Sequence, residues 1–113
     1  MSKKNSINEV SYSFLDLENR IISILKSIYD PEIPVDIYEL GLIYDIQISR
    51  KKKVKIIMTL TTPNCPVAES LPLEVKEKVK SIKEISNVNV ILTFDPPWSR
   101  DFMSEEARLE LNM

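Results

Sequence analysis

Three short segments alternate between apolar and polar residues, and this alternation constrains the fold more than any other feature of the chain. In residues 44–49, apolar side chains are separated by Asp45, Gln47 and Ser49, which is the pattern of a β-strand with one buried face. Residues 54–61 and 88–94 repeat the pattern. The side chains expected to face the core are Tyr44, Ile46, Ile48, Val54, Ile56, Met58, Leu60, Val88, Val90, Leu92 and Phe94.

A helix is predicted ahead of these strands. Its apolar residues recur at helical spacing, and Asp16 is the expected N-cap. The helix must stop near Tyr29, because Asp30 precedes Pro31 and is excluded from helical backbone angles. The same rule predicts an extended backbone for residues 30–34 (DPEIP). The apolar stripe consists of Leu17, Ile21, Ile24, Leu25 and Ile28.

A second helix is predicted after Cys65, and a short one near the C-terminus. The second helix has Lys and Glu over most of its remaining surface, and Pro72 inside it is expected to kink or split it. The C-terminal helix is expected to have Ser104 as its N-cap, with two glutamates near its positive end. The apolar stripe of the second helix consists of Leu71, Val75, Val79 and Ile82.

The resulting order is α-β-β-α-β plus a short C-terminal helix. This order predicts an α/β protein of the two-layer α+β kind, with a mixed three-stranded sheet covered on one face by two helices. Residues 1–15 are interpreted as a flexible arm and residues 16–113 as a single domain. Ile57 and Ile91 would point to the other face, where the C-terminal tail or a second subunit in a homodimer is expected to cover them.

Composition excludes several classes of function. The chain has no histidine, so it cannot contain a Ser/His/Asp or Cys/His catalytic unit, and its single glycine rules out a glycine-rich phosphate loop. The net charge of −2 argues against a phosphate-backbone binder, and the run RKKK at 50–53 is interpreted as a solvated hairpin turn. The start of the chain has two lysines but no apolar stretch of the kind found in a signal sequence, and no run reaches membrane-spanning length, so a reducing, cytoplasmic setting is the simplest interpretation.

The single cysteine, Cys65, is the first candidate for a functional residue. It falls between the second strand and Pro66, which suits the first position of a helix. Unpaired backbone N–H groups at a helix N-terminus favour the thiolate. The hydroxyl groups of Thr61 and Thr62 could donate hydrogen bonds to the sulfur or to a ligand. The alternative is that Cys65 is a small buried apolar residue and that the threonines are ordinary strand residues.

Two carboxylates form the second candidate. Asp30 and Glu32 would project to the same side of an extended segment. Together with Cys65 they would offer oxygen and sulfur ligands to a transition metal such as iron, although the same pair could serve only helix-end and turn chemistry. One cysteine cannot hold an iron–sulfur cluster, which generally takes four protein ligands. Any cluster would therefore be bound transiently and shared between subunits or with a partner.

A third candidate is the segment Pro96, Pro97 and Trp98. An exposed aromatic residue beside two rigid prolines loses little conformational entropy on docking, and so makes a good protein contact. The alternative is that Trp98 is a lid over the edge of the sheet.

Three motifs together resemble a known family. They are DPEIPVDIYELGLIYDI (30–46), TLTTPNCPVAESLP (59–72) and VNVILTFDPPWSRDFMSEEAR (88–108). They are similar to the metal–sulfur cluster assembly factors, which include SufT-type and PaaD-like proteins and eukaryotic cytosolic iron–sulfur targeting factors. The resemblance implies the iron–sulfur cluster assembly (NifU C-terminal-like) fold. It also implies a non-enzymatic, SUF-type accessory or targeting factor that works with iron–sulfur scaffold, carrier or client proteins.

The family resemblance also implies a functional pocket. Its members map onto Asp30, Glu32, Thr61, Thr62 and Cys65, with Cys65 as an unusually reactive thiol. PaaD-like proteins generally carry a cysteine-rich C-terminal extension that this chain lacks, which argues against that role. A thiol-dependent enzyme using Cys65 is the other alternative, and a nucleic-acid module is disfavoured because the chain has no GxxG loop and no basic face.

Overall fold

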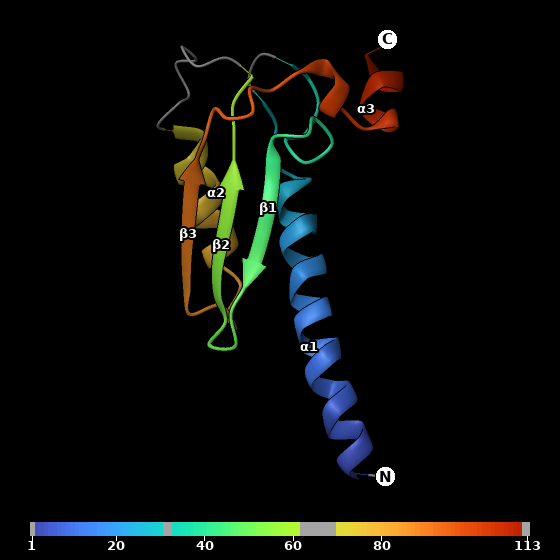
Figure 1. Ribbon diagram of the computed structural model, residues 1–113, viewed down its shortest axis with the longest axis vertical. Coiled ribbons are helices and arrows are strands. Elements are labelled where there is room, and N and C mark those ends of the chain that lie inside the picture. The colour runs from blue at the N-terminus through green and yellow to red at the C-terminus, as the bar shows by residue number, and fades with distance from the viewer. Residues whose placement is uncertain (1, 31–32, 62–69, 112–113) are drawn as a thin grey trace.

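Two helices pack on one face of a three-stranded sheet in the computed structural model (Figure 1). The structure describes residues 2–30, 33–61 and 70–111, with side chains from Phe14 onward. The elements are α1 (Ser2–Leu25), β1 (Ile43–Ile48), β2 (Lys53–Met58), α2 (Ser70–Lys80), β3 (Asn87–Leu92), a 3-10 turn η1 (Arg100–Phe102) and α3 (Glu105–Glu110). The predicted α-β-β-α-β order and two-layer α+β class are confirmed. No helix in these ranges is both long and apolar enough to cross a membrane.

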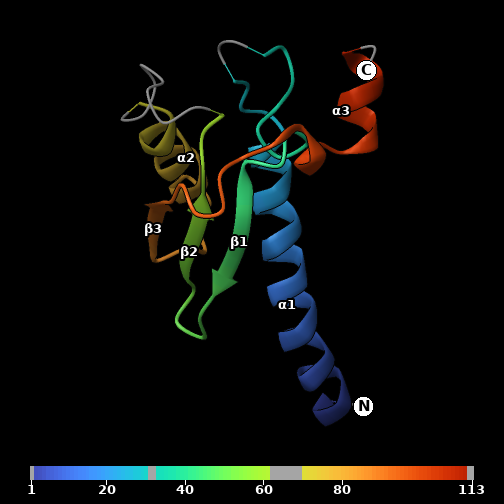
Figure 2. The ribbon, with the colours of Figure 1, turned by 45° about the horizontal axis from the view of Figure 1, so that its top comes forward.

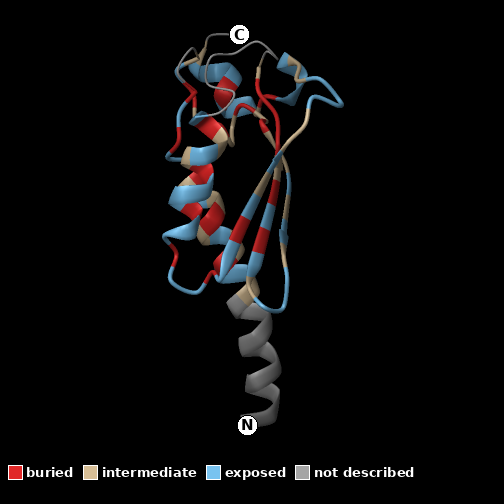
Figure 3. Ribbon diagram, turned by 90° about the vertical axis from the view of Figure 1, so that its left-hand side faces the viewer, coloured by how far each residue is buried: buried red, intermediate tan, exposed pale blue. Residues whose placement is uncertain are grey.

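The sheet is mixed, as the sequence predicts. Its order is β1-β2-β3, with β1 antiparallel and β3 parallel to β2. The four residues predicted to point inward from the second strand are all buried, as is Val88 of β3, whereas the inward residues of β1 are half-buried at this edge of the sheet. Figure 3 shows the buried positions alternating along the strands. Away from the strand ends, the two faces of the sheet are therefore assigned correctly from periodicity.

The core lies between the sheet and the two helices. The predicted stripe of the first helix is buried except for Ile24, which is half-buried, and the predicted stripe of α2 is buried throughout. Arg20 on α1 bonds Glu84, in the turn after α2, with 2.6 Å between Nη1 and Oε2. This exposed ion pair holds the pKa of the Glu84 carboxyl below its usual value.

Three sequence-based predictions about the helices and their ends were wrong. The first helix begins at Ser2, not at Asp16, since residues 2–15 contain neither proline nor glycine to interrupt it. It ends at Leu25, before the predicted Tyr29. Pro72 neither kinks nor splits α2, because it lies in the first turn, where a missing N–H costs nothing. The prediction that residues 1–15 form a flexible arm stays a prediction.

Three predictions at the strand ends were also wrong. Phe94 lies beyond β3 and is 39% exposed. Tyr44 was predicted to be a regular core-facing residue of the first strand. It is instead the extra residue of a β-bulge, because Ile43 and Asp45 pair with adjacent residues of β2. In the described part of the DPEIP segment the chain turns instead of staying extended, since the Val35 N–H donates to the Ile33 carbonyl at 2.7 Å.

The C-terminal segment 93–104, which we call the strap, crosses one end of the sheet and leads to α3 (Figure 2). The Trp98 Nε1–H donates to the Leu40 carbonyl at 2.8 Å, and the Ser104 N–H donates to the Glu39 carbonyl at 2.8 Å. Ser104 caps α3 as predicted, because its Oγ accepts from the Ala107 N–H. The strap leaves the open face of the sheet uncovered, so Ile91 is 36% exposed there and the expected cover by the tail is wrong.

Candidate functional site

One end of the sheet gathers the segments that carry the predicted site. The two parallel strands β2 and β3 finish there, α1 ends there, and the strap crosses it (Figures 1 and 2). Backbone hydrogen bonds hold the edges together, from the Thr59 N–H to the Leu42 carbonyl and from the Thr93 N–H to the Met58 carbonyl, each at 2.8 Å. We call this region, made of residues 26–30, 33–44, 59–61 and 93–99, the loop end. In mixed and parallel sheets the carboxyl ends of strands are the usual place for a site.

Asp30 lies at the loop end and is only 5% exposed. Its carboxylate Oδ1 accepts a hydrogen bond from the Ile33 N–H at 3.0 Å, and its own N–H donates to the Val35 carbonyl at 3.3 Å. Next to it, Tyr29 pairs with Asp36 in an isolated β-bridge. A carboxylate buried to this degree is rare in proteins unless it is bonded. The turn therefore fixes Asp30 in place.

Thr61 lies at the same end, on the chain leaving β2. After Met58 the backbone continues through Thr59 and Leu60, which are both buried, to Thr61, which is half-buried. Thr61 is the last described residue before the gap at 62–69. Asp30 and Thr61 thus both lie at the loop end, and the predicted pocket that would unite them stays a prediction.

The remaining three members of the predicted pocket are Glu32, Thr62 and Cys65, and they lie outside the described residues. The placement of Cys65 at a helix N-terminus and its approach to the carboxylates therefore stay predictions. Within residues 2–30, 33–61 and 70–111, no group of three or more Asp, Glu, His or Cys side chains could hold a metal ion. Any metal site at the loop end would need Cys65, Glu32 or a partner to complete it.

Two hydroxyl groups at the loop end were missed by the sequence analysis. The Tyr44 hydroxyl donates to the Pro96 carbonyl at 2.8 Å, and its ring meets the Phe102 ring edge-on at 5.8 Å between centroids. Burial raises the pKa of the Tyr44 phenol above its usual value, while a hydrogen bond with the Thr59 hydroxyl opposes the rise. Strand alternation puts Thr59 on the open face with Ile57, and no sequence signal shows that the bulge and strap bury it.

The segment Pro96, Pro97 and Trp98 forms part of the strap. Both prolines are exposed, whereas Trp98 is half-buried, packs on the core and uses its indole N–H internally. This geometry fits the alternative in which Trp98 covers the edge of the sheet and is not a docking residue. A docking role for the segment stays a prediction, and the exposed prolines are the part of it that a partner could reach.

Comparison with known proteins defines the class. Residues 18–91 match the family described as "Iron-sulfur cluster assembly protein". The matched range runs from the first helix to the last strand and includes both halves of the predicted pocket. The chain belongs to this family.

Individual relatives agree with this membership. A protein of Porphyromonas gingivalis named "Fe-S protein maturation auxiliary factor" is 49% identical over 98 residues, which cover 87% of this chain and 93% of that protein. The "Fe-S protein maturation auxiliary factor SufT" of Staphylococcus aureus is 34% identical, covering 76% of this chain and 98% of that protein. The crystal structure of a DUF59 domain, a domain of unknown function, from Bacillus anthracis superposes with a TM-score of 0.80 at 33% identity, covering 87% of this chain and 93% of that one.

Proposed function

We infer that the protein is a SUF-type auxiliary factor for the maturation of iron–sulfur proteins and acts in the cytoplasm without catalysing a reaction of its own. The observation that carries this inference is the similarity to maturation auxiliary factors over nearly the whole of their length. Its partners are iron–sulfur scaffold, carrier or client proteins. Iron, or a cluster in transit, is the cargo and not a resident cofactor.

We assign the handling of this cargo to the loop end. Cys65 acts as a transient sulfur ligand, and Asp30 and Glu32 contribute carboxylate oxygens, which together suit iron. Thr61 and Thr62 donate hydrogen bonds to the thiolate or to the cargo. The support from the geometry is that Asp30 is held at the loop end by its own turn and that Thr61, four positions before Cys65 in the sequence, lies at the same end.

The ligand number explains why such a site would pass its cargo on. A single thiol with one or two carboxylates falls short of the four protein ligands that a cluster generally takes. A cluster held here would keep open positions that a partner's ligands can fill. Transfer is then favoured over storage, which is what an auxiliary factor requires.

The test uses a strain that lacks the gene, complemented with wild-type protein or with Cys65→Ser. We expect wild-type protein to restore the activity of a [4Fe–4S] client enzyme under iron limitation, and Cys65→Ser to restore it only partly at equal protein level. The matched control is Ser23→Ala, on the exposed side of α1, which should behave like wild type. Full client activity in the strain without the gene would contradict the maturation role, whereas full rescue by Cys65→Ser would contradict only the role of the thiol.

A further inference from the structure

Five basic residues lie at the end of the sheet opposite the loop end, so the sequence-based expectation that the chain has no basic face is wrong. They make up a third of the 15 Lys and Arg residues and leave a net charge of −7 on the rest of a chain whose total is −2. None of the five takes part in an ion pair with another described residue. The charge of Glu84 acts on Lys52, but that carboxylate is already bonded to Arg20. We call these residues the basic patch: Arg50, Lys51, Lys52, Lys53 and Lys55.

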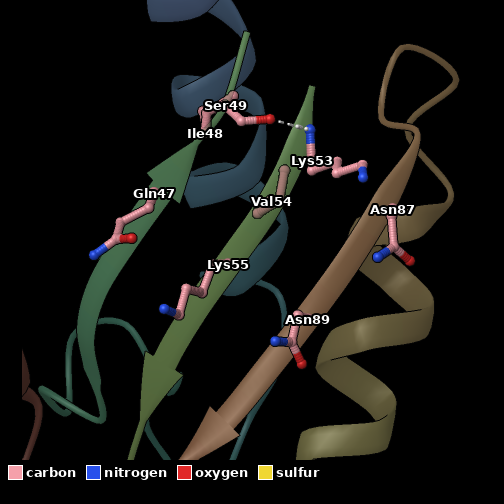
Figure 4. Close-up of a pocket in the computed structure, with 8 residues that line it drawn as sticks. All are labelled: Gln47, Ile48, Ser49, Lys53, Val54, Lys55, Asn87 and Asn89. Carbon is pink, nitrogen blue, oxygen red and sulfur yellow. Dashed lines mark hydrogen bonds between the residues drawn. The ribbon is translucent and has the colours of Figure 1, made fainter. Parts of the chain in front are cut away.

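The basic patch continues onto the open face of the sheet. Figure 4 shows Lys53 and Lys55 projecting from β2 on the face away from the helices. On β3, Asn87 pairs with Lys53 and Asn89 with Lys55. On β1, Gln47 pairs with Lys55. Together they line a shallow pocket of about 440 Å³. The lysine ammonium groups and the asparagine and glutamine amides on this face can all donate hydrogen bonds.

The turn that carries the charges is held in one conformation. The Ser86 Oγ donates to the carbonyl oxygens of Lys51 at 2.8 Å and Lys52 at 3.2 Å, and the Ser86 N–H donates to the Lys52 carbonyl at 3.0 Å. Within the turn, the Lys53 N–H donates to the Ser49 Oγ at 3.1 Å. A basic surface on a fixed backbone is preorganised, which lowers the entropy lost when a partner binds.

Lys52 occupies a position where the turn itself favours another residue. Its φ is +60°, in the left-handed region that glycine or asparagine adopts at lower cost. A lysine here is therefore not explained by turn geometry. It adds a fifth charge to the patch at the expense of local backbone strain.

We propose that the basic patch and the adjoining open face of the sheet dock an acidic segment of a partner protein. Lys53 and Lys55 are two positions apart on one strand, so their Cα atoms are separated by about 6.5 Å. An extended polypeptide with carboxylates at alternate positions repeats at the same spacing. The amides of Asn87 and Asn89 can donate to its carboxylates or bond its backbone. The proposal goes beyond the proposed maturation role and does not depend on it.

Two other occupants fit the surface less well. A second copy packed face to face through the same sheet surface would bring few carboxylates, because Asp45 is the one acid among the outward-facing strand residues and already accepts a hydrogen bond from Gln47 at 2.8 Å. A single-stranded nucleic acid would need aromatic side chains for base stacking, and none lines the pocket. The patch also lies far from the loop end (Figure 1), so a partner docked on it leaves the loop end accessible.

The test measures binding of a fluorescein-labelled peptide of alternating Glu and Val to the full chain by fluorescence anisotropy. We expect saturable binding at low salt that weakens as salt screens the charges. The variant Lys51→Gln/Lys53→Gln/Lys55→Gln should bind about tenfold more weakly, since steering and complementarity are both lost. The matched control, Lys76→Gln/Lys80→Gln/Lys83→Gln, removes the same charge from exposed positions on and after α2 and should stay within about twofold of wild type.

A second measurement locates the peptide independently of any variant. In ¹⁵N–¹H correlation spectra of the wild-type chain, we expect shifts in residues 45–57 and 86–91. Equal weakening in the two triple variants, no binding at low salt, or shifts confined to other residues would overturn the proposal. So would tighter binding of oligouridine than of the peptide with loss in the same variant, which would make the surface a nucleic-acid site.

Discussion

Replacing Gly41 with alanine tests how the strap is fastened to the body of the domain. Gly41 has φ +83°, and a Cβ added there would lie 2.3 Å from the Phe102 carbonyl oxygen and 2.8 Å from its carbonyl carbon. The left-handed backbone costs an alanine about 1–2 kcal/mol. Because the obstacle is backbone, the clash can be relieved only if the strap moves away.

The magnitude follows from what the strap would lose. Displacing it stretches or breaks the hydrogen bond from the Trp98 indole to the Leu40 carbonyl, worth about 1 kcal/mol, and loosens Met103, which is buried. With the backbone cost, Gly41→Ala should lower the free energy of unfolding by roughly 2–4 kcal/mol, a large part of the 5–15 kcal/mol typical of a domain.

Urea unfolding followed by tryptophan fluorescence is the suitable assay. Trp98 is the single tryptophan of the chain and lies in the strap, so it reports on this contact directly. The control Ser23→Ala, on the exposed side of α1, should change the free energy of unfolding by less than about 0.5 kcal/mol. A Gly41→Ala variant as stable as this control, with unchanged Trp98 emission, would refute the reasoning.

Three further predictions concern single side chains. Trp98→Phe should lower the free energy of unfolding by about 1–3 kcal/mol in urea titrations followed by circular dichroism, because it leaves the Leu40 carbonyl without its donor; no loss would mean that water replaces the bond. Lys52→Gly should raise the thermal midpoint or leave it unchanged, since the relief of left-handed strain, about 1–2 kcal/mol, offsets the entropy cost of glycine; a clear fall in the midpoint would contradict this. For Tyr44, burial raises the phenol pKa, so its contribution to stability is present below about pH 10 and is lost as the pH rises through the folded-state pKa. Above that pH, Tyr44→Phe should therefore lose less stability than wild type in parallel urea titrations. Identical losses in the two proteins would argue against a raised pKa for the Tyr44 phenol.

The sequence predicted the elements that depend on local periodicity. The apolar stripe from Leu17 to Leu25 and the alternation around Ile56 are set by which side chains must avoid water, and both were confirmed, with Ile24 alone half-buried in the stripe. The cap at Ser104 was also predictable, because it depends only on residues within one turn. The mixed sheet was also predicted, and the parallel pair in it is β2 with β3, the two strands joined through a helix.

The failures at the start of β1 and in the strap have a common physical cause in contacts between distant segments. The bulge at Tyr44 is stabilised by its hydrogen bond to Pro96, which is 52 positions away. Burial of Thr59 and the internal hydrogen bond of Trp98 likewise depend on where the strap crosses the loop end. Pro72 was misjudged because its effect depends on where the helix begins. For the candidate site, Asp30 and Thr61 both lie at the loop end, but the pocket itself stays a prediction because Glu32, Thr62 and Cys65 lie outside the described residues.

The most direct test of the account measures maturation of an apo client enzyme by a cluster-loaded scaffold in vitro, with and without the purified protein. Wild-type protein should increase the rate at which client activity appears, and Cys65→Ser, at the same concentration and with an unchanged circular dichroism spectrum, should not. A client that matures equally fast with wild-type protein, with the variant and with neither would contradict the central claim that this chain passes iron or a cluster through its single thiol.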